Sequence, residues 1–364
     1  MTPDALAAAV AAVPRQHYTH HPVHGSPPQT TAQAAIERDI LRAAGEADLT
    51  GKHILEIGTG TGYTGALLAE LVGPTGKVVS VDIDPALVTR ARALHAERLC
   101  PVEVVFGDGH DGVPDLAPYD VVMGWCSPTH IPGAWLKQVR PGGVISSPVY
   151  IAPVARAIGH LRAVVTQDET PAGVQIGTAM YVDMGQVVNE HLGVPIFYND
   201  AMDDGGAYVS VAWRGQIEGH EAAATLSMLT SPGHREKYPL GNDEAQTAIA
   251  WRDARAYLAA RAHAEKAVSL TTWGSGGPGY VSGVGFSSAD NAAVLTVDGE
   301  VLANRQDSPA LVKLRDHLGD WEAAGRPDLE RLAVVIEQDG GGWHVRATWR
   351  ASRPADAGGS EAGS

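Results

Sequence analysis

The chain has 364 residues, with 42 acidic against 27 basic side chains and a formal net charge of −15. This length predicts about two domains, and the acidic balance argues against nucleic-acid binding, which needs a basic face. Only two cysteines are present, so we expect no disulfide framework and a reducing, cytoplasmic location.

The N-terminal stretch 2–13 is apolar and rich in alanine, but it carries Asp4 and lacks a basic start. It is therefore predicted to be a helix that packs on a sheet, and neither an export signal nor a membrane span.

Four histidines follow, at His17, His20, His21 and His24. Histidine is the commonest metal-binding side chain, but no carboxylate or cysteine accompanies these four in the sequence. We expect a plain loop here, with substrate contact as the alternative and no metal ion.

A strand-like run at 54–57 is followed by a glycine-rich turn at 58–62. Glycines let the backbone approach a ligand closely, and open α/β sheets bind ligands at the carboxyl ends of their strands. Residues 60–65 match the dinucleotide fingerprint G-x-G-x-x-G, and Asp82 lies about twenty residues further on. However, an extra glycine, Gly58, precedes the match, and Glu56 lies in the end of the strand.

A carboxylate at Glu56 suits a cationic ligand better than a pyrophosphate, which it would repel. S-adenosylmethionine carries an amino group and a sulfonium, so the sequence favours this cofactor over NAD. A glycine turn without any ligand is the third alternative.

The next elements carry two further acids. A second strand at 77–82 ends in Asp82, whose carboxylate can accept both hydroxyls of a ribose. Asp84 is the expected N-cap of a helix at 85–99. A third strand at 102–106 ends in Gly107-Asp108-Gly109. An acid between two glycines can accept from an adenine amino group while the glycines leave room for the ring.

Strands and helices continue to alternate beyond this point. Strands are predicted at 119–124, 144–149, 156–166 and 174–184, with a helix at 135–139 closed by Arg-Pro-Gly-Gly at 140–143. This alternation predicts a doubly wound α/β sheet. Cys126 follows the strand at 119–124 and is expected to be a small buried thiol near the ligand-binding cleft.

Residues 186–350 contain no cofactor motif and are predicted to form an accessory α+β domain after a first domain at 1–185. Helices are expected at 222–230, 243–265 and 309–324, strands at 267–273, 280–286 and 292–297, and a hairpin at 332–337 and 343–349. Its tryptophans are expected mainly in the core, with a peptide-binding groove as the alternative: Trp251, Trp273, Trp321, Trp343 and Trp349. The tail 351–364 is predicted to be disordered.

A series of short motifs resembles the protein-L-isoaspartate O-methyltransferase family. In chain order these are VPR (13–15), LEIGTGTGY (55–63), VVSVDIDP (78–85), GDG (107–109), APYDVV (117–122), IP (131–132) and RPGG (140–143). The resemblance covers about residues 13 to 184 and implies a Rossmann-like S-adenosylmethionine-dependent methyltransferase fold. The residues assigned to the cofactor are Glu56, Gly58, Thr59, Gly60, Gly62, Asp82, Ile83, Asp108 and Gly109.

The substrate side departs from this family. The family places a serine before the first strand, over the substrate carboxylate, and the matching position here holds Ala32. Thr31 or Thr30 is expected to supply a substitute hydroxyl, and these two are the candidate catalytic residues. The divergence argues against an ordinary repair enzyme.

The sequence shows no recognisable set of general acid and general base residues, and carboxyl methylation does not need one. An aspartate with a pKa of about 4 is already ionised at neutral pH, so the protein has only to exclude water and align the reactants.

The resemblance is closer to relatives that methylate an aspartate of a ribosomally synthesised peptide, such as a lanthipeptide or graspetide, and so form aspartimide or isoaspartate. The missing serine, a shortened front loop, the C-terminal half and the motif WEAAGRP (321–327) favour this branch. The expected partner is then a precursor peptide, which another enzyme has already cyclised in some of these systems. The alternatives are a general isoaspartate repair enzyme with an added domain, and a binding module that has lost catalysis.

Overall fold

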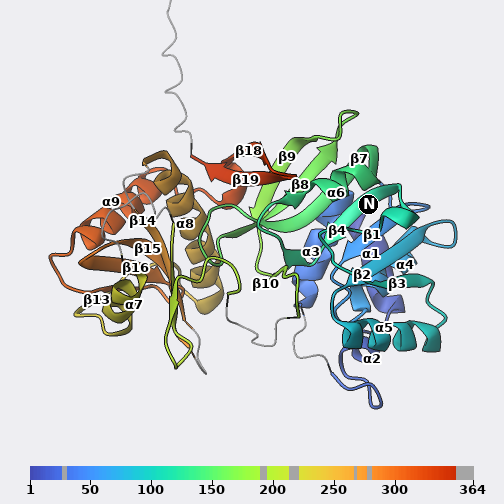
Figure 1. The fold of residues 1–364 in the computed structure, drawn as a ribbon, viewed down its shortest axis with the longest axis horizontal. Helices are drawn as coiled ribbons and strands as arrows, with labels where there is room; N and C mark the ends of the chain where they lie inside the picture. The colour runs from blue at the N-terminus through green and yellow to red at the C-terminus, as the bar shows by residue number, and fades with distance from the viewer. Residues whose placement is uncertain (27–30, 189–194, 213–220, 266–268, 277–280, 350–364) are drawn as a thin grey trace, which may run out of the picture.

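The computed structural model describes residues 1–26, 31–188, 195–212, 221–265, 269–276 and 281–349 (Figure 1). The candidate residue Thr30 and the predicted disordered tail 351–364 lie outside these ranges. Within the described part of the chain, no helix is both long and apolar enough to cross a bilayer.

The first half of the chain forms a seven-stranded sheet in the order β3-β2-β1-β4-β7-β8-β9. The pairings among the first five strands of this order are parallel, and the pairings of β7 with β8 and of β8 with β9 are antiparallel. The bounds are β1 His53–Ile57, β2 Lys77–Asp82, β3 Val102–Phe106, β4 Tyr119–Gly124, β7 Val139–Tyr150, β8 Ile158–Val165 and β9 Pro171–Thr178. The predicted doubly wound sheet is confirmed, and its strand order reverses between β1 and β4, where such sheets bind ligands.

Helices cover this sheet. They are α1 Pro3–Ala12, α2 Arg15–Thr19, α3 Gln33–Ala44, α4 Tyr63–Val72, α5 Pro85–Glu97 and α6 Gly133–Gln138, with a short 3-10 turn at Pro114–Leu116. The predicted caps are present, because Asp84 Oδ1 accepts from Ala86 N at 2.8 Å. The predicted N-terminal helix is confirmed as α1, but it packs chiefly on helices α4 and α3 and less on the sheet.

Two strand predictions were wrong in ways that affect the site. Strand β7 begins at Val139, and its pairing with β4 shifts register, so that residues 140–143 form a bulge instead of a turn before the strand. The strand expected at 174–184 is broken after Thr178. Its end forms β10, Val182–Asp183, which pairs with β5, Cys126–Ser127, as a separate two-stranded sheet.

The second half contains another seven-stranded sheet, in the order β11-β12-β14-β15-β16-β17-β13, and every adjacent pair is antiparallel. The strands are β11 Ala201–Met202, β12 Tyr208–Val211, β13 His234–Lys237, β14 Ser269–Gly274, β15 Ser282–Ser288, β16 Asn291–Thr296 and β17 Glu300–Ala303. The expected helices are confirmed as α7 Ala222–Thr230, α8 Glu244–Glu265 and α9 Pro309–Ala323, followed by a 3-10 turn at Leu329–Arg331. Strands β11 to β13 were not predicted.

The predicted C-terminal hairpin is confirmed as β18, Ala333–Asp339, and β19, Gly342–Thr348. Strand β19 also pairs with β6, Ile131–Pro132, in the first half of the chain. Figure 1 accordingly shows the red hairpin lying between the two halves. The division near residue 185 stays a prediction, and this strand pairing ties its two sides together.

The tryptophans of the second half belong mainly to the core, as expected. Trp251, Trp273 and Trp321 are buried, and the indole nitrogens of Trp251 and Trp321 donate to backbone carbonyls at 2.8 and 3.1 Å. Trp343 and Trp349 are half-buried against the same core.

Candidate functional site

The glycine-rich loop lies between β1 and α4 at the carboxyl end of the sheet. Gly58, Gly60 and Gly62 have φ values of 91°, 51° and 84°, a region that side chains disfavour. A Cβ added at Gly60 would meet no atom within 4 Å, whereas one at Gly62 would lie 3.3 Å from Ala91 and His95. Gly60 therefore faces open space, while Gly62 allows α5 to pack closely.

Asp82 is fixed at the end of β2 by backbone donors. Its Oδ2 accepts from Gly60 N and its Oδ1 accepts from Asp84 N, both at 2.9 Å. Burial raises the pKa of Asp82, and these hydrogen bonds oppose that shift. Asp82 and Ile83 are both half-buried. Because Asp82 also bonds to Gly60, the glycine loop and this acid face the same side of the candidate site.

Asp108 lies at the end of the neighbouring strand β3. Its Oδ1 accepts from His110 N at 2.9 Å and lies 2.8 Å from His110 Nδ1. The next residue, Gly109, has no room for a side chain, because a Cβ there would lie 2.7 Å from Ile57 Cγ2. Asp108 and Asp82 are thus both held rigidly at the carboxyl ends of adjacent strands.

Glu56 is placed differently, since it is fully buried beneath the loop. Its Oε2 accepts from Ser80 Oγ at 2.6 Å and its Oε1 accepts from Trp125 Nε1 at 2.9 Å. The buried Thr59 hydroxyl extends this chain, 2.6 Å from Ser80 Oγ. Burial raises the pKa of Glu56 to about 7, against the opposing effect of these hydrogen bonds. Direct cofactor contacts of Glu56 and Thr59 stay predictions.

Asp183 is a site residue that the sequence reasoning missed. Pairing of β10 with β5 brings it beside the ends of the parallel strands, where its Oδ1 accepts from Tyr150 OH at 2.6 Å and its Oδ2 accepts from Ile196 N at 2.9 Å. The contact joins segments far apart in the chain, and no local motif announces it.

Cys126 lies close enough to Asp82, Asp108 and Asp183 at the carboxyl ends of the strands for their charges to affect its thiol. Burial raises the pKa of its thiol, and Asp82, Asp108 and Asp183 raise it further. The raised pKa favours the neutral thiol over the thiolate, which is the nucleophilic form. The side chain is only partly buried, so the expectation of a buried thiol was wrong.

On the substrate side, Thr31 is half-buried next to Arg15. The Arg15 guanidinium donates to Thr31 O at 2.6 Å and to Gln33 Oε1 at 2.8 Å, and it lies 5.5 Å from the centre of the Tyr63 ring, which follows the glycine loop. Ala32 is the N-cap of α3 and provides no side-chain cap. Ala32 therefore offers no side-chain acceptor to the first amides of α3, and its match to the family's serine position stays a prediction.

Ser146, His160 and Asp39 form a buried polar cluster whose arrangement resembles a Ser-His-Asp catalytic triad. Ser146 Oγ lies 2.9 Å from His160 Nε2, and His160 Nδ1 lies 3.4 Å from Asp39 Oδ2. All three side chains are fully buried, so no substrate reaches Ser146. Tyr181 OH also donates to Asp39 Oδ2 at 2.5 Å, and the cluster fastens helix α3 to strands β7 and β8.

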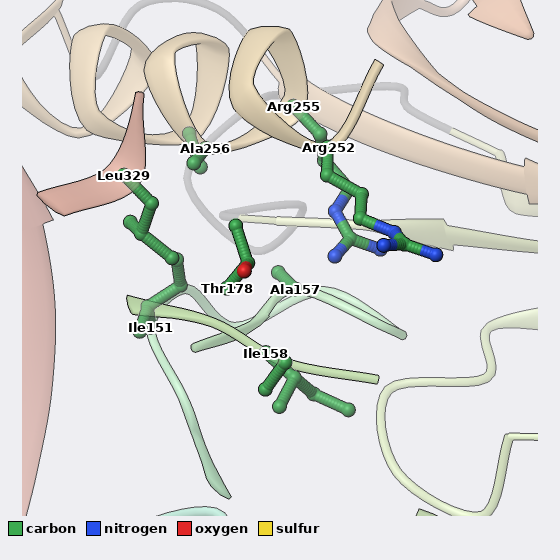
Figure 2. A pocket seen from close by; sticks show the side chains of 10 residues that line it. Ile151, Ala157, Ile158, Thr178, Arg252, Arg255, Ala256 and Leu329 are labelled. Atoms are coloured by element: carbon green, nitrogen blue, oxygen red, sulfur yellow. The ribbon is translucent and has the colours of Figure 1, made fainter. Parts of the chain in front are cut away.

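A small pocket separates helix α8 from the strands of the first half (Figure 2). Arg252 and Arg255 reach it from α8, opposite Ile151, Ile158 and Thr178. Burial lowers the pKa of Arg252. No residue of the predicted site lines this pocket, which belongs to the contact between the two halves.

Comparisons with known proteins place the first half in context. The family model of protein-L-isoaspartate(D-aspartate) O-methyltransferase (PCMT) matches residues 1–186. A protein-L-isoaspartate O-methyltransferase from Ignicoccus hospitalis is 43% identical over 104 residues, which are 28% of this chain and 49% of the relative. Protein-L-isoaspartate O-methyltransferase 2 of Archaeoglobus fulgidus is 43% identical over 100 residues, 27% of this chain and 46% of the relative.

The chain thus spans about half the length of the curated relatives it matches. A solved structure described as a protein-L-isoaspartate O-methyltransferase covers 94% of this chain and 94% of that chain, with 18% sequence identity and a TM-score of 0.46.

Proposed function

The chain belongs to the protein-L-isoaspartate O-methyltransferase family, and from this premise we propose that it is an S-adenosylmethionine-dependent carboxyl O-methyltransferase. Its substrate is the free carboxylate of an isoaspartyl residue in a polypeptide. The observation that carries the proposal is the open turn at Gly60 beside the acids of neighbouring strands, Asp82 and Asp108.

The residues at this edge suit the cofactor. Carboxylates favour a ligand that carries an ammonium and a sulfonium, and S-adenosylmethionine, when bound, supplies an electrophilic methyl group. Asp82, held by Gly60 N, accepts from the ribose hydroxyls. Asp108 accepts from the adenine amino group, and Ile83 and Gly109 border the ring. Glu56 adds negative potential from beneath the loop whenever it is ionised.

The substrate carboxylate needs orientation and no base, since it is ionised at neutral pH. The Thr31 hydroxyl and the uncapped amides at the start of α3 are suited to hold it. Arg15 adds positive charge nearby, and its contacts in the described structure are a carbonyl, an amide oxygen and an aromatic ring. The raised pKa of the Cys126 thiol disfavours the thiolate, which is the form that would compete for the methyl group.

A second candidate substrate is a normal aspartate of a ribosomally synthesised precursor peptide. The absence of the family's serine at Ala32 and the second half, attached through β19 and β6, favour it. In this reaction the next backbone nitrogen attacks the carbonyl carbon of the methyl ester. The amide proton and methoxide leave as methanol, and an aspartimide forms that water can open to isoaspartate.

Mass spectrometry with S-adenosylmethionine and two substrates separates these candidates. One substrate is a short generic isoaspartyl peptide, and the other is a precursor peptide encoded beside the gene, with and without its other modifications. A methyl gain on the generic peptide supports isoaspartyl methylation. Methylation or water loss on the precursor alone supports peptide tailoring.

The same experiment can overturn both candidates. If neither peptide reacts and calorimetry detects no binding of S-adenosylmethionine, the chain is a binding module that keeps the fold without the activity. The Asp82→Asn variant is the matched control for both measurements, because it keeps the shape of the side chain and removes the charge that the proposed cofactor site needs. It should bind S-adenosylmethionine more weakly than the wild type.

A further inference from the structure

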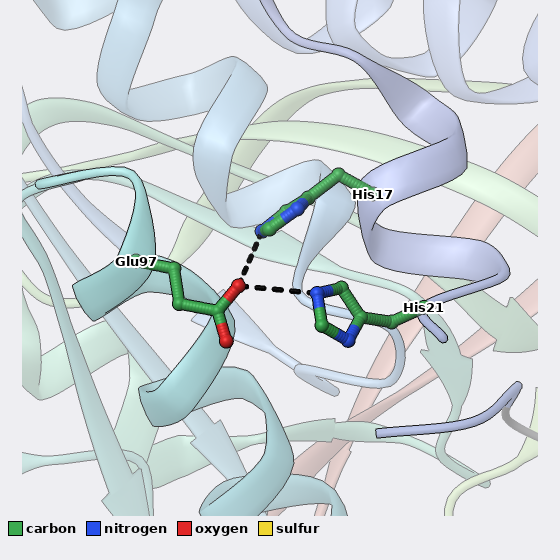
Figure 3. A group of neighbouring side chains, drawn as sticks. All are labelled: His17, His21 and Glu97. Carbon is green, nitrogen blue, oxygen red and sulfur yellow. Dashed lines mark hydrogen bonds and ion pairs between the residues drawn. The ribbon is translucent and has the colours of Figure 1, made fainter. Parts of the chain in front are cut away.

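Three of the N-terminal histidines meet one carboxylate. His17 comes from α2, His21 follows that helix, and Glu97 is the last residue of α5 (Figure 3). His24 lies three residues after His21. The Nε2 atoms of His21 and His24 lie 3.1 and 3.2 Å from the two oxygens of Glu97, and His17 Nε2 lies 4.0 Å from Oε2. The expected plain loop was wrong for His17, which lies in helix α2, and the fold brings these histidines a carboxylate that is distant in the sequence.

The segment that carries the histidines is anchored by other contacts. Arg90, also on α5, donates to Tyr18 O at 2.7 Å, to Gly25 O at 2.9 Å and to His24 O at 3.1 Å. The backbones of His21 and Gly25 exchange hydrogen bonds of 2.9 and 3.2 Å. The imidazoles are thus held near Glu97 by a fixed backbone, independently of their own contacts with it.

The donor set and its spacing match a transition-metal site. Zinc is bound tetrahedrally by imidazole nitrogen and carboxylate oxygen at about 2.0–2.2 Å, which separates neighbouring ligand atoms by about 3.3 Å. The 3.1 Å distance from His21 Nε2 to Glu97 Oε2 is close to that separation. Only the 4.0 Å distance from His17 must shorten. The donor atoms are also accessible, because the side chains are 10 to 44% exposed.

We propose that His17, His21 and Glu97, whose ligand atoms all lie within 4.8 Å of one another, bind a divalent transition-metal ion of the zinc class. The imidazole Nε2 atoms and the Glu97 carboxylate are the ligands. The ion replaces the proton that each Nε2 carries when it donates to an oxygen, so metal and protons compete for the site.

Metal binding also requires a local adjustment. His21 Nδ1 now lies 3.3 Å from Val23 N and 3.2 Å from His24 N, and His17 Nε2 lies 3.2 Å from Leu94 O. A ring that binds the metal through Nε2 carries its proton on Nδ1. The contacts of His21 with the two amides must therefore loosen as the ion enters.

The position of the site suggests its role. Arg90 also donates to Thr61 O in the glycine loop, at 3.1 Å, and the segment after Gly25 leads to Thr31. A metal ion would fasten residues 17–25 to α5, and Arg90 already joins these residues to the glycine loop. The metal thus stabilises the front of the proposed site without touching the reacting groups.

The test uses tag-free, metal-free, full-length protein titrated with Co²⁺, followed by its visible absorption, and with Zn²⁺ by calorimetry. We expect one ion per chain, with the intense visible bands of tetrahedral cobalt. His21→Ala and Glu97→Gln each weaken the affinity by about 10-fold or more. His20→Ala is the matched control, because His20 belongs to the same segment but contacts Thr19 Oγ1 instead of Glu97.

The proposal is overturned if wild-type protein binds neither ion. It is equally overturned if His21→Ala and Glu97→Gln bind as tightly as the wild type, or if His20→Ala loses as much affinity as they do. Circular dichroism without metal checks that each variant folds. Glu97→Gln keeps the proposal testable should His21→Ala fail to fold, because Glu97 is 44% exposed and tolerates substitution.

Discussion

Replacing Glu56 by glutamine should change how the stability of the protein depends on pH. Glu56 is fully buried, and burial raises its pKa from 4.5 to about 7 in the folded protein. Between these two values the folded state holds a proton that the unfolded chain has lost. The stabilising effect of that proton is complete below pH 4.5 and is lost as the pH rises through 7.

The magnitude follows from the same two values. Applying linkage between pH 5 and pH 8, ionisation of Glu56 lowers the free energy of unfolding by about 2–3 kcal/mol. Glutamine mimics the protonated acid, since its oxygen still accepts from Trp125 and its amide can donate to Ser80 Oγ. The variant should therefore be more stable than the wild type at pH 8 and nearly equal to it at pH 5.

Urea denaturation of both proteins at pH 5, 6, 7 and 8, followed by circular dichroism, measures this difference. The relevant transition is the one that the substitution shifts, because a chain of 364 residues can unfold in more than one step. Glu70→Gln, on the exposed side of α4, is the control for loss of one charge. A difference between Glu56→Gln and wild type that stays constant from pH 5 to pH 8 would refute the reasoning.

Four further predictions concern the site and its support. Asp82→Ala should weaken S-adenosylmethionine binding about 10-fold or more in calorimetry, whereas Thr31→Ala should slow methyl transfer about 10-fold with unchanged cofactor affinity. Equal cofactor affinity in Asp82→Ala and wild type would remove the ribose assignment. Asp39→Asn should lower the free energy of unfolding by about 1–3 kcal/mol, because it removes the charge and one of the two oxygens that accept from Tyr181 and from the partly exposed Arg38. Unchanged urea midpoints would contradict this. Cys126 should react with iodoacetamide at pH 8 more slowly in folded than in urea-unfolded protein, since its pKa is raised, and equal labelling by mass spectrometry would contradict the assignment of a neutral thiol.

Local patterns were sufficient for most of the first half. Strands that end in an acid or a glycine turn were predicted to within a residue at β1, β2, β3 and β4. Because the carboxyl ends of parallel strands meet at one edge, these predictions also brought Gly60, Asp82 and Asp108 together. The helices of the second half followed from periodicity, and the hairpin from its glycine turn.

Burial changed the interpretation of two predicted residues. Glu56 and Thr59 lie in the motif next to Gly60, yet both are buried and bonded to Ser80. Sequence alone marks a residue as part of a loop, but the direction of its side chain depends on what packs beneath it. Gly62 likewise serves the packing of α5, which no local pattern reveals.

The sequence by itself therefore determined the parallel sheet, the glycine loop and the acids that follow the strands, because each depends on neighbours within a few residues. Only the tertiary structure decided which distant groups meet. It brought Glu97 to His21, Asp183 to the edge near Cys126, and β19 to β6. Such contacts join segments separated by tens to hundreds of residues, and their free energy comes from the packing of the whole chain, which local periodicity does not encode.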